Sequence, residues 1–166
     1  DLPVLGTTDT ILHAHREIAV AIAIANPGSK KKLIEKCRKN SNIHFPSFIH
    51  PTVWIGQKVS WKEGCIVYPG VTINYETEMG RFVTINMNAA IGHNCRLHDY
   101  STLSPGVNLG GFTQLGEESF IGIGASTLQS ITIGEKSIVG AGAIVIKPVS
   151  EGVTVAGNPA KIIRKK

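Results

Sequence analysis

Bulky apolar residues recur at every sixth position from Ile49 to Val145, and this spacing divides residues 49–150 into seventeen blocks without an insertion or deletion. Sixteen of the seventeen residues that open a block are apolar, and only Thr127 is not. The fifth residue of each block is never charged or aromatic. Because the fifth residue and the next opening residue are two apart, both side chains point to one face of a short strand. The pattern therefore predicts a series of short strands, each with one buried face.

The second residue of each block is glycine eight times and asparagine twice. We expect these residues at corners between strands, because they tolerate positive φ. A period of six that continues over 102 residues is too short for a helical stripe or a heptad, and it indicates a parallel β-helix. Three blocks per turn would give between five and six triangular coils. With stacked strands about 4.8 Å apart, the prism would be about 27 Å long.

The flanking segments follow other patterns, and they divide the chain into three parts. We expect a partial α/β unit over residues 1–48, the β-helix over residues 49–150 and a C-terminal tail over residues 151–166. The open ends of a β-helix need covering, and the first and third parts are suited to cover them. Because the first residue is Asp1 and no helix precedes the first expected strand, we expect that an upstream piece of the α/β unit is missing from this sequence.

Within the first part, the order of elements is strand, turn and helix. The expected strands are Pro3–Leu5 and the apolar run Ile18–Ile24, and a helix is expected over Lys30–Arg38. Ser29 precedes this helix and is a suitable N-cap. The N-terminus of such a helix can hold a phosphate.

Composition and charge narrow the class of function. The net charge is +5, and much of the excess lies in two basic runs, Lys30–Lys39 and Lys161–Lys166, which are typical of solvated faces or of contacts with an anionic small ligand. No basic stripe carries interleaved aromatic residues, so nucleic-acid binding is not expected. No apolar stretch approaches the roughly 20 residues of a membrane span, and no signal peptide is present, so we expect a cytoplasmic protein without membrane insertion. The three cysteines are expected to be buried free thiols.

The blocks resemble those of the hexapeptide-repeat acyltransferases, and four further segments resemble the sugar O- and N-acetyltransferases of the sialic-acid and bacillosamine type. These segments are Pro3–Gly6 with Ile22–Asn26, Phe48–Pro51, Ile91–Cys95 and Gly157–Lys161. The resemblance implies a left-handed β-helix that assembles into a homotrimer. It also implies acetyl-CoA as co-substrate, no metal, and a sugar or nucleotide-sugar acceptor in the biosynthesis of surface polysaccharides.

The candidate general base is His93, the third residue of its block, just past Gly92 and outside the column of inward-pointing residues. Imidazole exchanges protons near neutral pH, which suits removal of a proton from an attacking hydroxyl or amine. In the family, a carboxylate commonly follows this histidine, whereas here the next residue is Asn94. An amide can orient an imidazole but cannot offset the charge of an imidazolium, so we expect Asn94 to give weaker support.

The resemblance assigns roles to residues on neighbouring coils. Gly111 lies eighteen residues after His93, hence one coil along, and its N–H would donate to the thioester oxyanion. Asn86 and Asn88 are candidates for acceptor binding. The expected coenzyme-binding residues are Gly111, Ile123, Ala141, Lys147, Lys161 and Arg164.

Three alternatives remain open at this point. Ile91–His98 also resembles the pair of histidines in γ-class carbonic anhydrases, where three imidazoles from adjacent subunits hold zinc. For the third ligand, the preceding coil offers Gln57 and Tyr75, and the histidines His44 and His50 lie at the entrance of the β-helix. A serine-type acetyltransferase would carry an all-helical N-terminal region instead of the strand and helix expected here. A non-catalytic trimeric scaffold is the third alternative, and Asn94 gives it some support.

Overall fold

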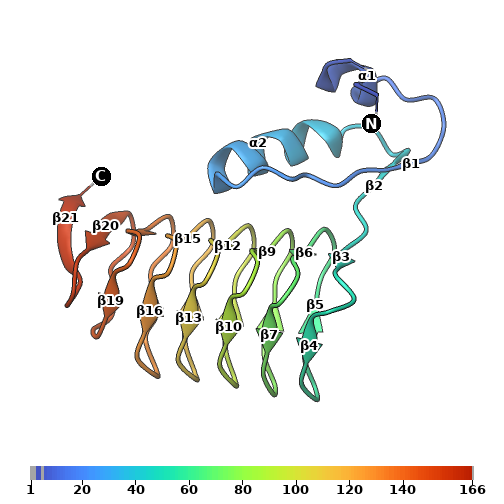
Figure 1. The fold of residues 1–166 in the computed structure, drawn as a ribbon. Helices are drawn as coiled ribbons and strands as arrows, with labels where there is room; N and C mark the ends of the chain where they lie inside the picture. Colours follow the sequence, from blue (N-terminus) through green and yellow to red (C-terminus); the bar gives the residue numbers. More distant parts are fainter. Residues whose placement is uncertain (1–2, 5, 166) are drawn as a thin grey trace.

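The computed structural model describes residues 3–4 and 6–165, and strands of two residues recur in it at every sixth position from β3 (Phe48–Ile49) to β19 (Ile144–Val145). Strands three apart in the chain pair in parallel, and the coils follow one another along a prism (Figure 1). The expected parallel β-helix is confirmed.

Three sheets form the faces of the prism, and we number them in the order in which the chain reaches them. The first sheet contains β3, β6 (Ile66–Val67), β9 (Thr84–Ile85), β12 (Thr102–Leu103), β15 (Phe120–Ile121), β18 (Ile138–Val139), β20 (Val153–Ala156) and β21 (Lys161–Lys165). The second sheet contains β4 (Trp54–Ile55), β7 (Thr72–Ile73), β10 (Ala90–Ile91), β13 (Asn108–Leu109), β16 (Ser126–Thr127) and β19. The third sheet contains β5 (Ser60–Trp61), β8 (Glu78–Met79), β11 (Arg96–Leu97), β14 (Gln114–Leu115) and β17 (Thr132–Ile133).

The core is the column of opening and fifth residues inside the prism. Residues such as Ile73 and Leu103 have no exposed surface, and the same cluster continues from Cys65 to Val155. In the first coil, Ile55 and Trp61 remain 37% and 41% exposed, because no coil stacks on their N-terminal side. The burial expected from the repeat is therefore confirmed from the second coil onward, except that Thr127 is only half-buried.

The expected reason for glycine at the second position of a block is wrong. Positive φ occurs at the fourth position instead, as at Asn94, where φ is 57°. At the second position, the neighbouring coil leaves no room for a side chain. A Cβ on Gly92 would lie 2.5 Å from the backbone nitrogen of Gly111 in the next coil. Glycine is needed there for close approach of two backbones.

The N-terminal unit contains α1 (Thr8–Leu12), β1 (Ile18–Ala19), α2 (Pro27–Cys37) and β2 (Ile43–His44), and β1 pairs in parallel with β2. The sequence pattern missed α1. It also predicted too long a strand, since the strand in the apolar run comprises only Ile18–Ala19. Pro3 and Val4 are not in a strand, and Leu5 lies outside the described residues. No helix in the described part of the chain combines the length and the apolar character needed to cross a membrane.

The N-cap of α2 is Asn26 and not Ser29. The Asn26 side chain accepts a hydrogen bond from the Ser29 N–H at 2.9 Å. Pro27 follows Asn26 as the first helical residue, where its fixed φ suits the helix and its missing N–H costs nothing. The helix therefore starts three residues earlier than the sequence pattern predicts.

Helix α2 lies along the first sheet (Figure 1), and a buried lysine attaches it there. Lys30 is 1% exposed, and its Nζ donates to the carbonyl oxygen of Phe82 at 2.7 Å, to Thr84 Oγ1 at 3.1 Å and to Thr102 Oγ1 at 3.0 Å. Three oxygen acceptors therefore surround the nitrogen of this buried side chain. The N-terminal unit thus covers a face of the prism and not its open first coil.

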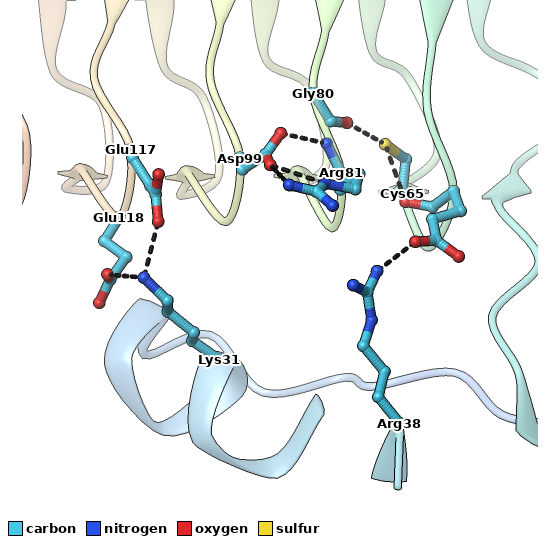
Figure 2. Close-up of polar contacts among 9 residues, drawn as sticks. Lys31, Arg38, Cys65, Gly80, Arg81, Asp99, Glu117 and Glu118 are labelled. Atoms are coloured by element: carbon cyan, nitrogen blue, oxygen red, sulfur yellow. Dashed lines mark hydrogen bonds and ion pairs between the residues drawn. The ribbon is translucent and has the colours of Figure 1, made fainter. Parts of the chain in front are cut away.

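Salt bridges at the corner between the third and first sheets reinforce this attachment (Figure 2). Lys31 contacts Glu117 and Glu118, each at 2.7 Å, and Arg38 contacts Glu63. The expectation for the first basic run is therefore wrong in part. Lys30 and Lys31 hold the helix to the prism, so they are unavailable to a small anionic ligand.

The C-terminal tail covers the last coil. β20 pairs in parallel with β18, and β21 turns back antiparallel to β20. The Ala160 N–H donates to the carbonyl oxygen of Ile144 at 2.8 Å, which ties the tail to the second sheet as well. The tail therefore meets the expectation that it covers one end of the β-helix.

Candidate functional site

The turns between the second and third sheets stack into a column that we call the second corner. Successive turns are one coil apart because β10 pairs with β13 in a register of eighteen residues, with Ile91 opposite Leu109. The third residues of the blocks that form these turns are Gln57, Tyr75, His93, Gly111, Gln129 and Lys147. The structure thus places His93 and Gly111 on neighbouring coils of one corner, as predicted.

The His93 imidazole is exposed and is held by two neighbours. Its Nδ1 lies 2.9 Å from Asn94 Oδ1. The ring of Phe112, on the next coil, meets the imidazole edge to face, with the ring centres 5.0 Å apart and the planes at 84°. Phe112 remains 52% exposed, so the aromatic contact leaves one side of the site open. The sequence pattern did not single out Phe112.

A carboxylate lies one coil before Asn94, where the sequence pattern did not indicate one. Asn94 Nδ2 donates to Glu76 Oε2 at 2.9 Å, and Lys58 Nζ, a further coil back, donates to Glu76 Oε1 at 3.0 Å. Lys58 also donates to the hydroxyl of Tyr75 at 2.9 Å. Hydrogen bonding to Lys58 is the largest cause that lowers the pKa of the Glu76 carboxyl below its ordinary value. Glu76 is therefore an ionised acceptor.

Gly111 leaves room for the reactive nitrogen of His93. A Cβ on Gly111 would lie 2.7 Å from His93 Nε2, well inside van der Waals contact. The Gly111 N–H donates to no other group among the described residues. An unpaired donor beside an open imidazole nitrogen is the combination that stabilises an oxyanion during acyl transfer.

Two threonines fix the peptide group that carries the Gly111 N–H. Thr113 Oγ1 donates to the carbonyl oxygen of Gly110 at 2.7 Å, and the Gly110 N–H donates to Thr127 Oγ1 at 3.0 Å. The two hydroxyl oxygens are 3.0 Å apart, so Thr127 must donate to Thr113, whose only proton is already used. The one polar opening residue of the repeat thus closes a ring of hydrogen bonds around Gly110. This role could have been found from the sequence, because Thr127 alone breaks the apolar pattern.

The remaining candidates lie elsewhere on the prism. Asn86, Asn88, Ile123 and Ala141 all belong to turns between the first and second sheets, which we call the first corner, and Ile123 is 62% exposed. Lys147 lies on the second corner, three coils beyond His93. Lys161 and Arg164 are exposed on β21. One chain therefore brings together His93, Asn94 and Gly111, while the strand β10 separates them from Asn86 and Asn88.

The geometry does not favour zinc. His98 lies beyond β11, at the corner between the third and first sheets, so its imidazole and that of His93 do not converge within one chain. His50 is turned toward Thr52, with Nδ1 and Oγ1 2.9 Å apart. Within residues 3–4 and 6–165, no three His, Cys, Asp or Glu side chains are grouped so that they could hold a metal ion.

The chain is similar to several known proteins. No protein-family model matches the chain. The GDP-perosamine N-acetyltransferase of Escherichia coli O157:H7 is 32% identical over 84 residues, which are 51% of this chain and 38% of that protein. The chain thus matches well under half the length of this curated relative.

Several solved structures match over most of both chains. The acetyltransferase domain of PglB from Neisseria gonorrhoeae has a TM-score of 0.93 and 31% identity, and the match covers 97% of this chain and 79% of that one. PerB from Caulobacter crescentus, solved with CoA and GDP-perosamine, has a TM-score of 0.85 and 34% identity over 88% of this chain and 70% of that one. The PglB domain has also been solved with acetyl coenzyme A. The fold is therefore a left-handed β-helix, and the chain belongs to the hexapeptide-repeat sugar acyltransferases.

Proposed function

We propose that this chain transfers an acetyl group from acetyl-CoA to an amine or hydroxyl of a nucleotide-linked sugar, with His93 as general base. The observation that carries the proposal is the open His93 Nε2 beside the Gly111 N–H, which has no acceptor among the described residues. The Escherichia coli protein that matches is a GDP-perosamine N-acetyltransferase, and PerB was solved with GDP-perosamine, which favours an amino sugar as acceptor.

The reaction would proceed by attack of the acceptor nitrogen on the thioester carbonyl carbon. His93 Nε2 takes the proton that the nitrogen loses, and the Gly111 N–H stabilises the negative charge that develops on the carbonyl oxygen. When the intermediate collapses, the C–S bond breaks and the coenzyme leaves as a thiolate. The imidazolium then returns its proton to the sulfur, so that His93 is restored for the next cycle.

The acyl donor would lie along the edge of the prism. The exposed apolar side chains of Ile123 and Ala141 are one coil apart and suit the pantetheine arm. The cations Lys147, Lys161 and Arg164 are exposed toward the C-terminal coils, where they suit the phosphates of the coenzyme. Asn86 and Asn88 lie on the same corner as Ile123 and are the proposed contacts for the acceptor.

A site that combines the first-corner residues with His93 requires a second copy of the chain. Since Asn86, Asn88 and Ile123 lie on the first corner and His93 lies on the second, a site that uses both must form between copies. A closed ring of three copies would bring a first corner against a second corner three times. We therefore propose a homotrimer with three sites at its interfaces.

We place the reaction in the cytoplasm and in the assembly of surface glycans. A nucleotide-linked sugar, like the one in the matched structure, is an activated building block for glycan assembly. All three cysteines of this chain are free and buried, as suits a reducing compartment. The N-terminal unit over residues 1–48 is the proposed nucleotide-sugar-binding part, the coils over 49–150 the acyl-transfer part and residues 151–166 the coenzyme-contacting tail.

The test measures thiol release from acetyl-CoA against a panel of nucleotide-linked amino sugars and sialic acids, with L-serine as a further acceptor. We expect turnover with at least one nucleotide-linked amino sugar and none with serine. His93→Ala should lower this turnover at least ~10²-fold, the usual contribution of general acid–base catalysis, and leave the oligomer intact. Equal turnover in the variant would remove His93 from the mechanism. Stoichiometric zinc with hydration of CO2, and no thiol release, would replace the proposal by the carbonic anhydrase alternative.

A further inference from the structure

A chain of hydrogen bonds leads along the second corner from Lys58 to His93. Lys58, Glu76 and Asn94 are the fourth residues of the blocks that form three successive turns of this corner, and their φ values are 58°, 55° and 57°. Because the three backbones share one conformation, their side chains leave the corner in the same direction and meet one another. The contacts are 3.0 Å from Lys58 to Glu76, 2.9 Å from Glu76 to Asn94 and 2.9 Å from Asn94 to His93.

Lys58 and Glu76 fix which group donates and which accepts in each of these hydrogen bonds. Lys58 can only donate, and the ionised Glu76 carboxylate can only accept. The Asn94 group that faces Glu76 must therefore be the NH2, which leaves Oδ1 for His93. An amide oxygen can only accept, so the proton of a neutral His93 must lie on Nδ1. The free lone pair is then on Nε2, the nitrogen beside Gly111.

We propose that Glu76 is a positioning residue that fixes the tautomer of His93 through Asn94, and thereby keeps Nε2 ready to take a proton. The carboxylate that the family resemblance leads us to expect next to the histidine is thus supplied from the preceding coil. This inference rests on the proposed role of His93 as general base. It deepens that role, because it makes a residue with no contact to the substrate responsible for the reactive state of the imidazole.

The position of Lys58 decides what Glu76 contributes. Its ammonium group is bonded to the carboxylate, so the pair is close to neutral as a whole. The amide of Asn94 also separates the carboxylate from the imidazole. Glu76 therefore acts mainly by orienting Asn94 and His93, and adds little negative charge beside an imidazolium. Glu76 therefore helps Asn94 to orient the imidazole of His93, but it does not offset the positive charge of an imidazolium as an adjacent carboxylate would.

The first experiment reads the tautomer directly, without any substrate. Long-range 1H–15N NMR correlations at about pH 9, where imidazoles are neutral, distinguish a proton on Nδ1 from one on Nε2. His93→Ala identifies the His93 signals among the six histidines. We expect the Nδ1–H form in the wild type and a mixture of both forms in Glu76→Gln, since glutamine can accept or donate. A wild-type spectrum with the proton on Nε2 would overturn the inference.

The second experiment exchanges the carboxylate of Glu76 and the amide of Asn94 between the two positions. Glu76→Gln should lower kcat about 10-fold and leave the KM for acetyl-CoA unchanged, in the range seen when a supporting hydrogen-bond partner is removed. Asn94→Asp alone would put two carboxylates in contact and should also lower kcat. When both substitutions are combined, the amide now at position 76 could donate to the carboxylate now at position 94, and that carboxylate could accept from His93. We expect kcat to return to within about threefold of the wild-type value, a gain that independent sites would not show.

The pH profile of the double variant supplies a further readout. A carboxylate directly on the imidazole favours its protonated form, so the acid limb of the kcat profile should move to higher pH than in the wild type. Glu78→Gln is the matched control, because Glu78 lies on β8 and contacts Arg96 outside this chain of hydrogen bonds. It should change neither kcat nor the tautomer.

The two proposals fail in different ways. If His93→Ala keeps full activity, the proposed function of His93 is lost, while the NMR experiment still tests its tautomer. If His93→Ala is inactive but Glu76→Gln has the kcat, pH profile and tautomer of the wild type, Glu76 has no positioning role. A double variant no better than Glu76→Gln alone would also contradict the inference.

Discussion

Single residues decide which atoms can reach the reacting centre. The imidazole of His93 lies over Gly111 so closely that even one methyl group would enter its space, with 2.7 Å between the added Cβ and Nε2. The same glycine supplies the N–H proposed for the oxyanion. The proposed base, His93, and the proposed oxyanion donor, the Gly111 N–H, therefore both require glycine at position 111.

Replacement of Gly111 by alanine should separate catalysis from folding. The added Cβ would push His93 Nε2 away and shield the N–H, so we expect kcat to fall at least ~10²-fold, as when one oxyanion donor is lost. Steady-state assays of thiol release measure the effect, and the thermal unfolding midpoint shows whether the fold is kept. Activity of Gly111→Ala within threefold of the wild type would contradict the oxyanion role.

Gly116→Ala is the matched control for crowding between coils. Gly116 lies at the corner between the third and first sheets, away from the proposed site, and an added Cβ would lie 2.5 Å from the backbone nitrogen of Glu135. This variant should lower the unfolding midpoint and keep the kcat of the folded protein near the wild-type value. An equal loss of kcat in both variants would mean that crowding alone explains the result at Gly111.

The sequence indicated part of the site, and the period of the repeat explains which part. His93 and Gly111 are eighteen residues apart, and the constant length of a coil places them together. The same offset joins Glu76 to Asn94, but the spacing does not show in which direction a side chain turns from the corner. That direction depends on the positive φ of the fourth residues, which the pattern assigned to the second residues. The sequence pattern therefore missed the Glu76 carboxylate, although Glu76 lies one coil from Asn94 on the same corner.

At the scale of elements, the strand pair β13–β16 is interrupted beside the site. Only Asn108 and Ser126 are paired there, because the Gly110 N–H donates to the hydroxyl of Thr127 and not to its backbone carbonyl. In the neighbouring pair β10–β13, both residues of each strand are paired, and the Gly92 N–H donates to the carbonyl oxygen of Leu109 at 2.9 Å. The interruption and the ring of hydroxyls together orient the peptide group before the Gly111 N–H.

Thr127→Val should restore an apolar opening residue and remove this ring. We expect the thermal unfolding midpoint to stay within a few degrees of the wild-type value, because the valine suits the core and regular pairing of β13 with β16 becomes possible. The kcat should fall about 10-fold, since the Gly111 N–H is no longer held toward the oxyanion. Thr127→Ser keeps the hydroxyl and serves as the matched control, with near wild-type kcat. Equal kcat in the valine and serine variants would show that the ring has no part in catalysis.

The attachment of α2 to the first sheet makes stability depend on pH through Lys30. Burial is the largest cause that lowers the pKa of the Lys30 amine in the folded chain, from 10.5 to about 7. Between these two values the unfolded chain binds one more proton than the folded chain. The free energy of unfolding should therefore rise with pH in this window, by up to about 1.4 kcal/mol per pH unit from this group.

Urea unfolding at pH 7.0 and pH 8.5 measures this dependence. Lys30→Met should abolish the part of the rise that Lys30 contributes, and the comparison of two proteins cancels the other titrating groups. It should also lower stability at both pH values, because three acceptors, Phe82 O, Thr84 Oγ1 and Thr102 Oγ1, lose their donor. Lys32→Met removes an exposed lysine of the same helix and should keep the wild-type slope. A wild-type slope in Lys30→Met would exclude Lys30 as its source.

At the scale of the whole molecule, the repeat determines the prism but not its covering. Each coil buries the same positions and pairs with the next at one fixed register, so a constant period of six suffices to predict the β-helix. The N-terminal unit has no such repetition. The start of α2 depends on the Asn26 cap and Pro27, and its placement on a face depends on Lys30 meeting oxygens that are more than fifty residues away in the chain. Such individual long-range contacts produce no repeating pattern in the sequence, so the placement of α2 could not be predicted from it.

The proposed trimer can be tested by mixing two inactive variants. His93→Ala damages the second corner only, and Ile123→Glu would place a charge in the proposed pantetheine wall of the first corner only. If each site combines corners from two copies, one quarter of the sites in randomly mixed trimers contain two undamaged corners. After co-refolding of equal amounts, we expect activity of about a quarter of the wild-type value, although each variant alone is inactive. No recovery from fully mixed trimers would mean that both corners of a working site belong to one chain, which the separation of His93 from Ile123 by strand β10 and its neighbours argues against.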